Sequence, residues 1–223
     1  MKKLEPIGTF GPIVAKTKLT KEETLELYNI CLDSNEPDNE KLVGYIKEEN
    51  KITEKLRSSK VLPTIIKQIE NYIKEIDGGN YSQAVKEHDF DSLVGLRSAW
   101  YNKQIHMEHN PIHNHVYSAD LVCVIYPKVV LDENVENFKV NNSTFDKQQG
   151  QITFLYGQTP NLNGFGDASI SILPEEGDIL IFPSSMYHYT TPVLGDSCRY
   201  SISCNFEIHK HIKRIFLKGN YEF

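Results

Sequence analysis

Residues 177–188 read GDILIFPSSMYH, and residues 199–206 read RYSISCNF. In the first stretch a glycine turn leads into a short apolar run that Pro183 ends, which is typical of a buried strand, and His188 follows. The second stretch alternates polar and apolar side chains, as a strand with two different faces does. These two stretches therefore predict two strands of a β fold.

Period two places Arg199, Ser201 and Ser203 on one face of the second strand, with Tyr200 and Ile202 on the other. A polar face headed by an arginine must meet water or an anion, because an unpaired buried charge is costly. The guanidinium fork matches a carboxylate with two hydrogen bonds, and a serine hydroxyl can add a third. A small dicarboxylate is therefore a fitting ligand for Arg199 and Ser201.

Similar short stretches, separated by turn residues, predict further strands. The full predicted set is Leu96–His106, Asp120–Pro127, Gln151–Tyr156, Ala168–Leu173, Asp178–Phe182 and Arg199–Ile208. Strands at this spacing after a helical block suggest an α+β fold, with a double-sheet barrel or jelly roll and helices packed on one face. We place this core at residues 93–223 and expect Lys128–Gln149 to be a surface excursion.

The first 92 residues are mainly helical by their pattern and are expected to support the barrel. After an extended start at Pro12–Thr17, Thr20 and Glu23 form a capping box ahead of an apolar helical face. A second helix is predicted at Leu62–Ile76, where isoleucines recur at helical spacing. Between the two we expect a loop with one short helix around Leu42–Glu49. This region is also a candidate homodimer surface.

Composition narrows the class of protein. The 24 basic and 30 acidic residues give a net charge of −6, which argues against a protein that coats nucleic acid. The four cysteines form no Cys-x-x-Cys pair, so we expect reduced thiols and a cytoplasmic location, in the host cytoplasm if a phage encodes the protein. No apolar run reaches the roughly 20 residues of a membrane span, and the first twelve residues do not resemble a signal peptide.

Two histidines, His113 and His115, are separated by one residue, so in an extended segment both project to the same side. Neutral imidazole is a good ligand for iron(II). Two histidines with a third donor leave positions open for a chelating keto acid and for oxygen. His106 and His109 lie on opposite faces of a regular strand, and we expect neither to be a ligand.

The stretches at 177–188 and 199–206 resemble the second half of the iron(II)- and 2-oxoglutarate-dependent oxygenases, which are built on a double-stranded β-helix. The resemblance covers roughly residues 94–208, and NPIHNHVYSADLVCVIYP at 110–127 is similar to a branch found in phages and marine bacteria. It implies that His188 binds iron and that Arg199, in an Arg-x-Ser pattern, binds the distal carboxylate of 2-oxoglutarate. The implied enzyme is a dioxygenase that hydroxylates an unidentified substrate and releases succinate and CO2.

One position departs from the family pattern, in which the first metal motif is His-x-Asp. In one alignment His113 is the first ligand and His115 stands in for the carboxylate. In the other His115 is the ligand, His113 supports it, and Asp120 can supply an acid. We take the metal set to be His113, His115 and His188. The candidates for a further cosubstrate contact are Tyr101, Asn102 and Tyr126. Of these we select Tyr126.

Two other functions compete with catalysis. A non-catalytic cupin-like module could carry a metal or another ligand on the same barrel, and a structural jelly roll would bind no iron, since fold alone does not decide function. Arg199 with Ser201 favours the enzyme, because a plain metal-binding module needs no carboxylate anchor. The candidate prime substrates are a protein side chain, a nucleobase or a small metabolite. The loop Gly157–Asp167 is a candidate lid.

Overall fold

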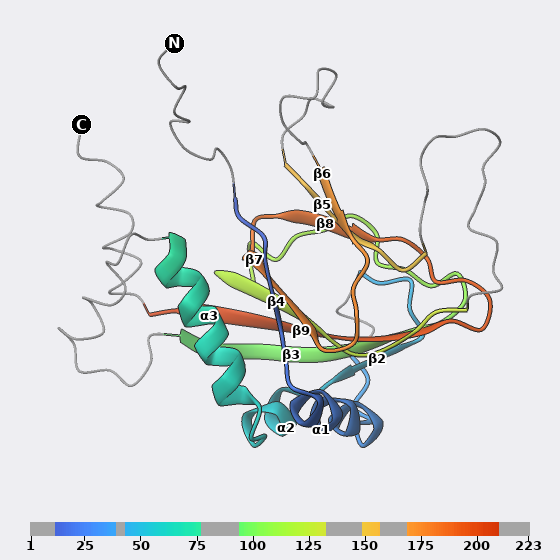
Figure 1. The fold of residues 1–223 in the computed structure, drawn as a ribbon, viewed down its shortest axis with the longest axis horizontal. Coiled ribbons are helices and arrows are strands. Elements are labelled where there is room, and N and C mark those ends of the chain that lie inside the picture. The colour runs from blue at the N-terminus through green and yellow to red at the C-terminus, as the bar shows by residue number, and fades with distance from the viewer. Residues whose placement is uncertain (1–11, 39–42, 77–93, 133–148, 157–168, 210–223) are drawn as a thin grey trace, which may run out of the picture.

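Two antiparallel sheets lie face to face in the computed structural model, with three helices on the outer face of the larger sheet (Figure 1). The structure describes residues 12–38, 43–76, 94–132, 149–156 and 169–209. The larger sheet has the strand order β1-β7-β4-β9-β3-β2, and the smaller has β6-β5-β8. The strands are β1 Ala15–Lys18, β2 Glu48–Lys51, β3 Val94–Gln104, β4 Leu121–Val130, β5 Ile152–Leu155, β6 Ser169–Ile172, β7 Asp178–Pro183, β8 Tyr187–Thr190 and β9 Cys198–Ile208.

The register of the larger sheet aligns polar residues across its inner face. Asn102 of β3 lies opposite Ser201 of β9, and Gln104 lies opposite Arg199. On the other side of β3, Glu49 of β2 lies opposite Asn102. Because directly opposed side chains share a face, these five residues form two polar rows between the sheets.

Apolar side chains form two clusters, one on each face of the larger sheet. The outer cluster lies between the sheet and the helices and includes Leu27, Ile69 and Ile202. The inner cluster joins the two sheets and includes Phe182 of β7 and Phe154 of β5. Strict alternation along the central strands places alternate residues in the two clusters, as the pattern at 199–206 predicted.

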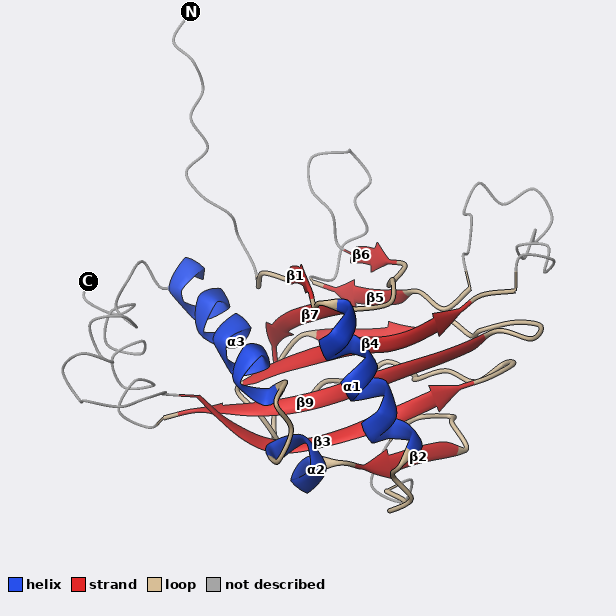
Figure 2. Cartoon of the chain, turned by 60° about the horizontal axis from the view of Figure 1, so that its bottom comes forward, coloured by secondary structure: helices blue, strands red, loops and turns tan. Residues whose placement is uncertain are grey.

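Helices α1 (Lys21–Leu32), α2 (Thr53–Arg57) and α3 (Leu62–Ile76) cover the outer face of the larger sheet (Figure 2). The predicted capping box is confirmed: the Glu23 amide donates to the Thr20 hydroxyl at 3.2 Å, and the Thr20 amide donates to the Glu23 carboxylate at 3.0 Å. The predicted bounds of the second long helix, now α3, are confirmed as well. No helix in the described segments is long and apolar enough to cross a membrane.

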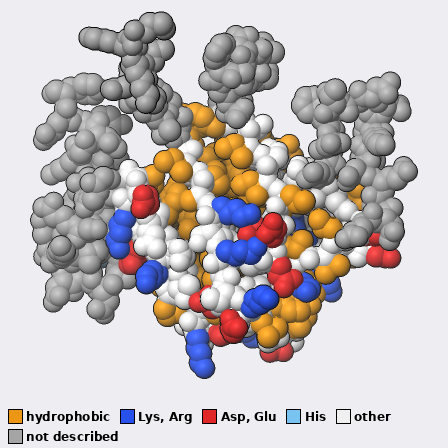
Figure 3. Space-filling view, in the orientation of Figure 1, with side chains coloured by type: hydrophobic (Ala, Val, Ile, Leu, Met, Phe, Trp, Pro, Cys, Tyr) orange, Lys and Arg blue, Asp and Glu red, His pale blue; other side chains and the backbone are white. Residues whose placement is uncertain are grey.

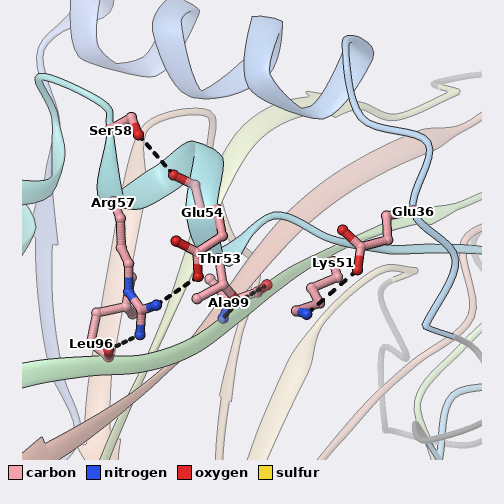
Figure 4. A network of polar contacts seen from close by, with 8 residues as sticks. All are labelled: Glu36, Lys51, Thr53, Glu54, Arg57, Ser58, Leu96 and Ala99. Atoms are coloured by element: carbon pink, nitrogen blue, oxygen red, sulfur yellow. Dashed lines mark hydrogen bonds and ion pairs between the residues drawn. The ribbon is translucent and has the colours of Figure 1, made fainter.

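A small polar network holds α2 against β3 (Figure 4). The Thr53 hydroxyl donates to the Ala99 carbonyl at 3.2 Å and accepts from the Ala99 amide at 2.9 Å. Arg57 donates to the Leu96 carbonyl at 3.1 Å and pairs with Glu54 at 2.6 Å. The β3–β9 register shifts just after Leu96, so α2 supplies partners where the ladder is irregular.

Replacing Thr53 by valine should lower the free energy of unfolding by about 1–3 kcal/mol, because the buried Ala99 amide loses its partner and the Ala99 carbonyl keeps only its bond from the Ile52 amide. Urea unfolding measures the difference. The matched control is Ser58→Ala, which removes an exposed hydroxyl that donates to the Glu54 carbonyl at 3.1 Å and should change stability by no more than about 0.5 kcal/mol. Equal losses in the two variants would contradict the anchoring role of Thr53.

The short helix expected around Leu42–Glu49 is wrong. The segment enters strand β2 at Glu48, where it pairs with β3, and the short helix is α2, further along the chain. The N-terminal region therefore supplies the two edge strands β1 and β2 of the larger sheet as well as helices. The excursion expected at Lys128–Gln149 begins later than predicted, because residues 128–130 belong to strand β4. Residues 133–148 and the loop Gly157–Asp167 lie outside the described residues.

Charged side chains of both signs lie next to one another on the face seen in Figure 3. Ion pairs in the described structure follow this mixture, for example Lys16 with Asp178 at 2.7 Å and Lys103 with Glu48 at 3.0 Å. The described part of this face has no broad basic patch of the kind that binds a nucleic-acid backbone.

Candidate functional site

Three histidines from distant parts of the chain meet in space. His113 and His115 lie between β3 and β4, and His188 lies in β8. An isolated antiparallel bridge joins His113 to His188, with each amide donating to the other's carbonyl at 3.0 Å. The His115 amide donates to the Ser184 carbonyl at 2.8 Å. As a result, one ring nitrogen of each histidine lies within 4.8 Å of the other two.

Backbone carbonyls determine which ring nitrogen of two of these histidines carries the proton. His113 Nδ1 lies 2.7 Å from the Pro111 carbonyl oxygen, and His188 Nδ1 lies 3.0 Å from the Met186 carbonyl oxygen. A carbonyl only accepts, so Nδ1 is the donor in both rings and Nε2 keeps a free lone pair. Metal-binding histidines are usually oriented by such a bond from the opposite ring nitrogen.

The three imidazoles are held in the neutral form. Burial, together with the proximity of His113, lowers the pKa of His188 to about 3 and that of His115 to about 4. Burial also lowers the pKa of His113. Since only unprotonated imidazole binds a metal, the cluster is ready for a cation at neutral pH.

Arg199 is the largest fully buried side chain in the described structure. Its guanidinium donates to the Gln104 side chain and to the carbonyl of Gly150, a glycine in the left-handed region with φ of 66°. Its carbon Cζ lies 5.5 Å from the centre of the Tyr126 ring. Within the described residues no carboxylate lies at ion-pair distance from this cation, which is a costly state for a buried charge.

Two buried donors beside each other lack a partner among the described residues: Arg199 Nε and the Tyr126 hydroxyl. Burial lowers the pKa of Arg199 and raises the pKa of Tyr126 to about 12, so the phenol keeps its proton. A guanidinium and a phenol together suit an anion that accepts several hydrogen bonds, such as a carboxylate. The donor set therefore fits the distal carboxylate of 2-oxoglutarate.

A protein-family model with the description "Putative 2OG-Fe(II) oxygenase" matches residues 98–205, which include all three histidines and Arg199. The matched segment, which holds the histidine cluster and Arg199, belongs to the 2OG-Fe(II) oxygenases. The protein is an oxidoreductase with iron(II) as its metal and with 2-oxoglutarate and O2 as cosubstrates. The family match favours this enzyme over the competing cupin-like binding module. No curated protein sequence matches the chain.

Solved structures share the fold of this oxygenase. A Pseudomonas putida prolyl-4-hydroxylase has a TM-score of 0.52 at 11% identity, covering 88% of this chain and 92% of its own. A viral collagen prolyl hydroxylase from Paramecium bursaria Chlorella virus-1, in a 2-oxoglutarate complex, has a TM-score of 0.50 at 13% identity, covering 86% and 94%. HygX from Streptomyces hygroscopicus, with nickel and 2-oxoglutarate bound, has a TM-score of 0.52 at 8% identity, covering 88% and 83%. The α+β double-stranded β-helix is thus confirmed.

Other predicted residues of the oxygenase lie as follows. Asp120 is outside the histidine cluster, and its carboxylate accepts from the Ile208 amide at 2.8 Å. Tyr101 faces the helices, where its hydroxyl contacts Asn50 at 2.8 Å. Ser201 is buried on the inner face opposite Asn102. His106 and His109 lie outside the cluster; His106 is exposed and His109 is partly exposed.

Two residues that the sequence analysis did not select connect the halves of the site. Gln104, which contacts Arg199, also donates to the Thr190 hydroxyl at 3.1 Å. Thr190 lies two residues after His188 on β8, and its hydroxyl accepts from the Asn110 amide at 2.8 Å. The signal for Gln104 was the alternation along β3, which places it on the same face as Asn102.

A cavity of about 420 Å³ opens beside the cluster. Its lining includes His113, His115, Asn102 and Glu49, and the Glu49 side chain is only 2% exposed. Burial, aided by the nearby carboxylates of Asp38 and Glu108, raises the pKa of Glu49 to about 7. An acidic group thus lies within the oxygenase's inner cavity with its charge poorly compensated.

The free energy of unfolding should depend on pH through Glu49. The pKa of Glu49 is about 7 in the folded state and roughly 4.3 in the unfolded chain. Between about pH 4.3 and pH 7 the folded state therefore binds more protons at Glu49 than the unfolded state does. The stability that the protonated group contributes is therefore full below about pH 4 and is lost as pH rises through 7. Relative to Glu49→Gln, the wild type should lose up to about 3 kcal/mol between pH 4 and pH 8 in urea unfolding. A constant difference between the two proteins would contradict this shift.

Proposed function

We propose that this oxygenase holds iron(II) with His113, His115 and His188 and hydroxylates a substrate bound in the adjacent cavity. The observation that carries the proposal is the pairing of three neutral imidazoles with a buried arginine that has no carboxylate partner in the described part of the chain. A metal-binding module needs the first feature alone. An enzyme that uses a keto dicarboxylate needs both.

Arg199, Tyr126 and Ser201 are proposed to hold the distal carboxylate of 2-oxoglutarate. Bound iron and 2-oxoglutarate supply the oxidising chemistry, which consumes O2 and yields succinate and CO2. The chain's own residues bind and orient. Gln104 holds the Arg199 guanidinium in place, while Phe182, whose ring centre is 4.9 Å from that of His188, keeps water from one side of the histidines.

The histidine set predicts how metal and cosubstrate depend on each other. Three neutral imidazoles leave the site one charge less negative than two histidines and a carboxylate, so iron alone should bind weakly. A dianionic cosubstrate supplies the missing negative charge. Iron affinity should therefore rise when 2-oxoglutarate is present, and the two ligands should strengthen each other by the same factor.

Anaerobic titration with iron(II), with and without 2-oxoglutarate, tests the proposal. The expected result is the weak visible charge-transfer band of the iron–keto acid chelate, at one equivalent and only with both ligands present. Iron binding without this band would favour a metal-binding module. No binding of iron would favour a structural barrel.

We also propose a cytoplasmic location and a homodimer. The four cysteines are free thiols, three of them buried, which suits a reducing compartment. Leu25 and Leu32 of α1 are exposed apolar side chains on the helical face that would pair. Sedimentation velocity measures the oligomeric state.

A further inference from the structure

The inner cavity carries an unusual carboxylate. Glu49 and its neighbour Glu48 lie on opposite faces of β2. Glu48 faces the helices and is paired, with its carboxylate 3.0 Å from Lys103 Nζ and 3.0 Å from the Tyr101 hydroxyl. Glu49 faces the cavity, and its Oε2 has no partner among the described residues. Since a buried carboxylate without a partner is costly, the contrast points to a ligand for Glu49.

More acceptors surround Glu49. Asn102, directly across the β2–β3 pair, is 2% exposed, and its Oδ1 also lacks a partner among the residues described. Gly44 packs so closely that an added Cβ would lie 2.5 Å from both Glu49 Oε1 and Asn110 Oδ1. The carboxylate and the Asn110 amide oxygen therefore lie together on one wall. This wall presents oxygen acceptors to the cavity.

Cations that could neutralise this wall lie elsewhere in the described structure. Lys51 is the one lysine or arginine in the cavity lining that the structure describes, and its exposed side chain lies 3.4 Å from the Glu36 carboxylate. Asp38 also lines the cavity, and its carboxylate contributes to the raised pKa of Glu49. The local field therefore favours a positively charged ligand.

We infer that the prime substrate carries a cationic nitrogen group, an alkylammonium or a guanidinium, which Glu49 binds while Asn102 accepts a further N–H bond. This inference rests on the proposed function, because the same cavity is lined by His113 and His115. The cationic group anchors the substrate on the β2 side, and a carbon further along it lies next to the histidines. The cavity of about 420 Å³ suits a small metabolite or one protein side chain.

Binding to the protein loaded anaerobically with iron(II) and 2-oxoglutarate tests this inference. The probes are n-butylammonium and n-butylguanidinium, with pentanamide and pentanoate as neutral and anionic probes of similar length. Isothermal titration should give measurable affinity for a cation, at least tenfold weaker affinity for the amide and none for pentanoate. Tighter binding of the ammonium probe or of the guanidinium probe would each support the inference, and the tighter of the two would identify the head group.

The Glu49→Gln variant keeps the size of the side chain and removes its charge. It should weaken cation binding about 10- to 100-fold, as loss of a charged hydrogen-bond partner does. The control is Glu48→Gln, on the outer face of the same strand, which should leave cation affinity unchanged. Equal affinity for the amide and the cations, or unchanged cation binding in Glu49→Gln, would overturn the inference.

The same samples separate this inference from the proposed function. The visible band of the iron–2-oxoglutarate chelate is recorded before each titration and should be the same in wild type, Glu49→Gln and Glu48→Gln. If the band is present and no cation binds, the inference about the substrate is wrong and the proposed function stands. If the band is missing from the wild type, the proposed function itself fails.

Discussion

Replacing His188 by alanine is expected to abolish the iron–2-oxoglutarate chelate and the turnover that depends on it. His188 contributes a buried neutral imidazole whose Nε2 is free, because Nδ1 donates to the Met186 carbonyl. Loss of a residue that only orients a ligand already costs about 10- to 100-fold in metal affinity, so loss of the ligand should cost more than about 100-fold. Iron affinity is measured by anaerobic titration, and turnover by succinate release.

His109→Ala is the control, because His109 lies on the same connection between β3 and β4 as His113 and His115 but outside the cluster, stacked on Tyr45 at 6.2 Å between ring centres. It should bind iron as the wild type does. Native-like iron affinity in His188→Ala would show that the cluster is not the metal site.

Replacing Arg199 by methionine should affect binding and stability in opposite directions. Removing one member of a buried charge pair costs about 2–5 kcal/mol of binding, so the KM for 2-oxoglutarate should rise by roughly 30-fold or more. Without the ligand, however, Arg199 is a buried cation with no carboxylate partner among the described residues. Its replacement by an apolar side chain should leave the unliganded protein as stable or more stable.

Both effects can be followed in one thermal unfolding series. Adding 2-oxoglutarate and manganese(II) should raise the Tm of the wild type and not that of Arg199→Met. The control is Arg97→Met, on the same strand as Gln104. Arg97 is exposed and makes a long ion pair of 3.7 Å with the Glu207 carboxylate, so this variant should respond to 2-oxoglutarate as the wild type does. A normal response to 2-oxoglutarate in Arg199→Met would contradict its role as the carboxylate anchor.

The positions of the residues proposed to bind the cosubstrate were predictable, because they depend on alternation within single strands. Strict alternation at 199–206 was enough to place Arg199 and Ser201 on one face, and alternation along β4 put Tyr126 on the inner side with Val124. The start of helix α1 was equally predictable, since its capping box involves residues only three positions apart. These features depend on neighbours in the chain, which a sequence displays directly.

Long-range pairing decides the rest of the site. The residues EENK of β2 have little strand preference of their own, and they form a strand because β3 pairs with them. Glu49 therefore had no visible role until the register placed it opposite Asn102. Likewise, the bridge between His113 and His188 joins segments 75 residues apart, so their separation could not be judged from spacing alone.

A crystal structure of the protein grown without oxygen, with manganese(II) in place of iron and with 2-oxoglutarate, tests the central claim most directly. The account predicts one metal ion bound to the Nε2 atoms of His113, His115 and His188, with the distal carboxylate of 2-oxoglutarate against Arg199 and Tyr126. A metal held by fewer than these three histidines, or a carboxylate that does not contact Arg199, would contradict it.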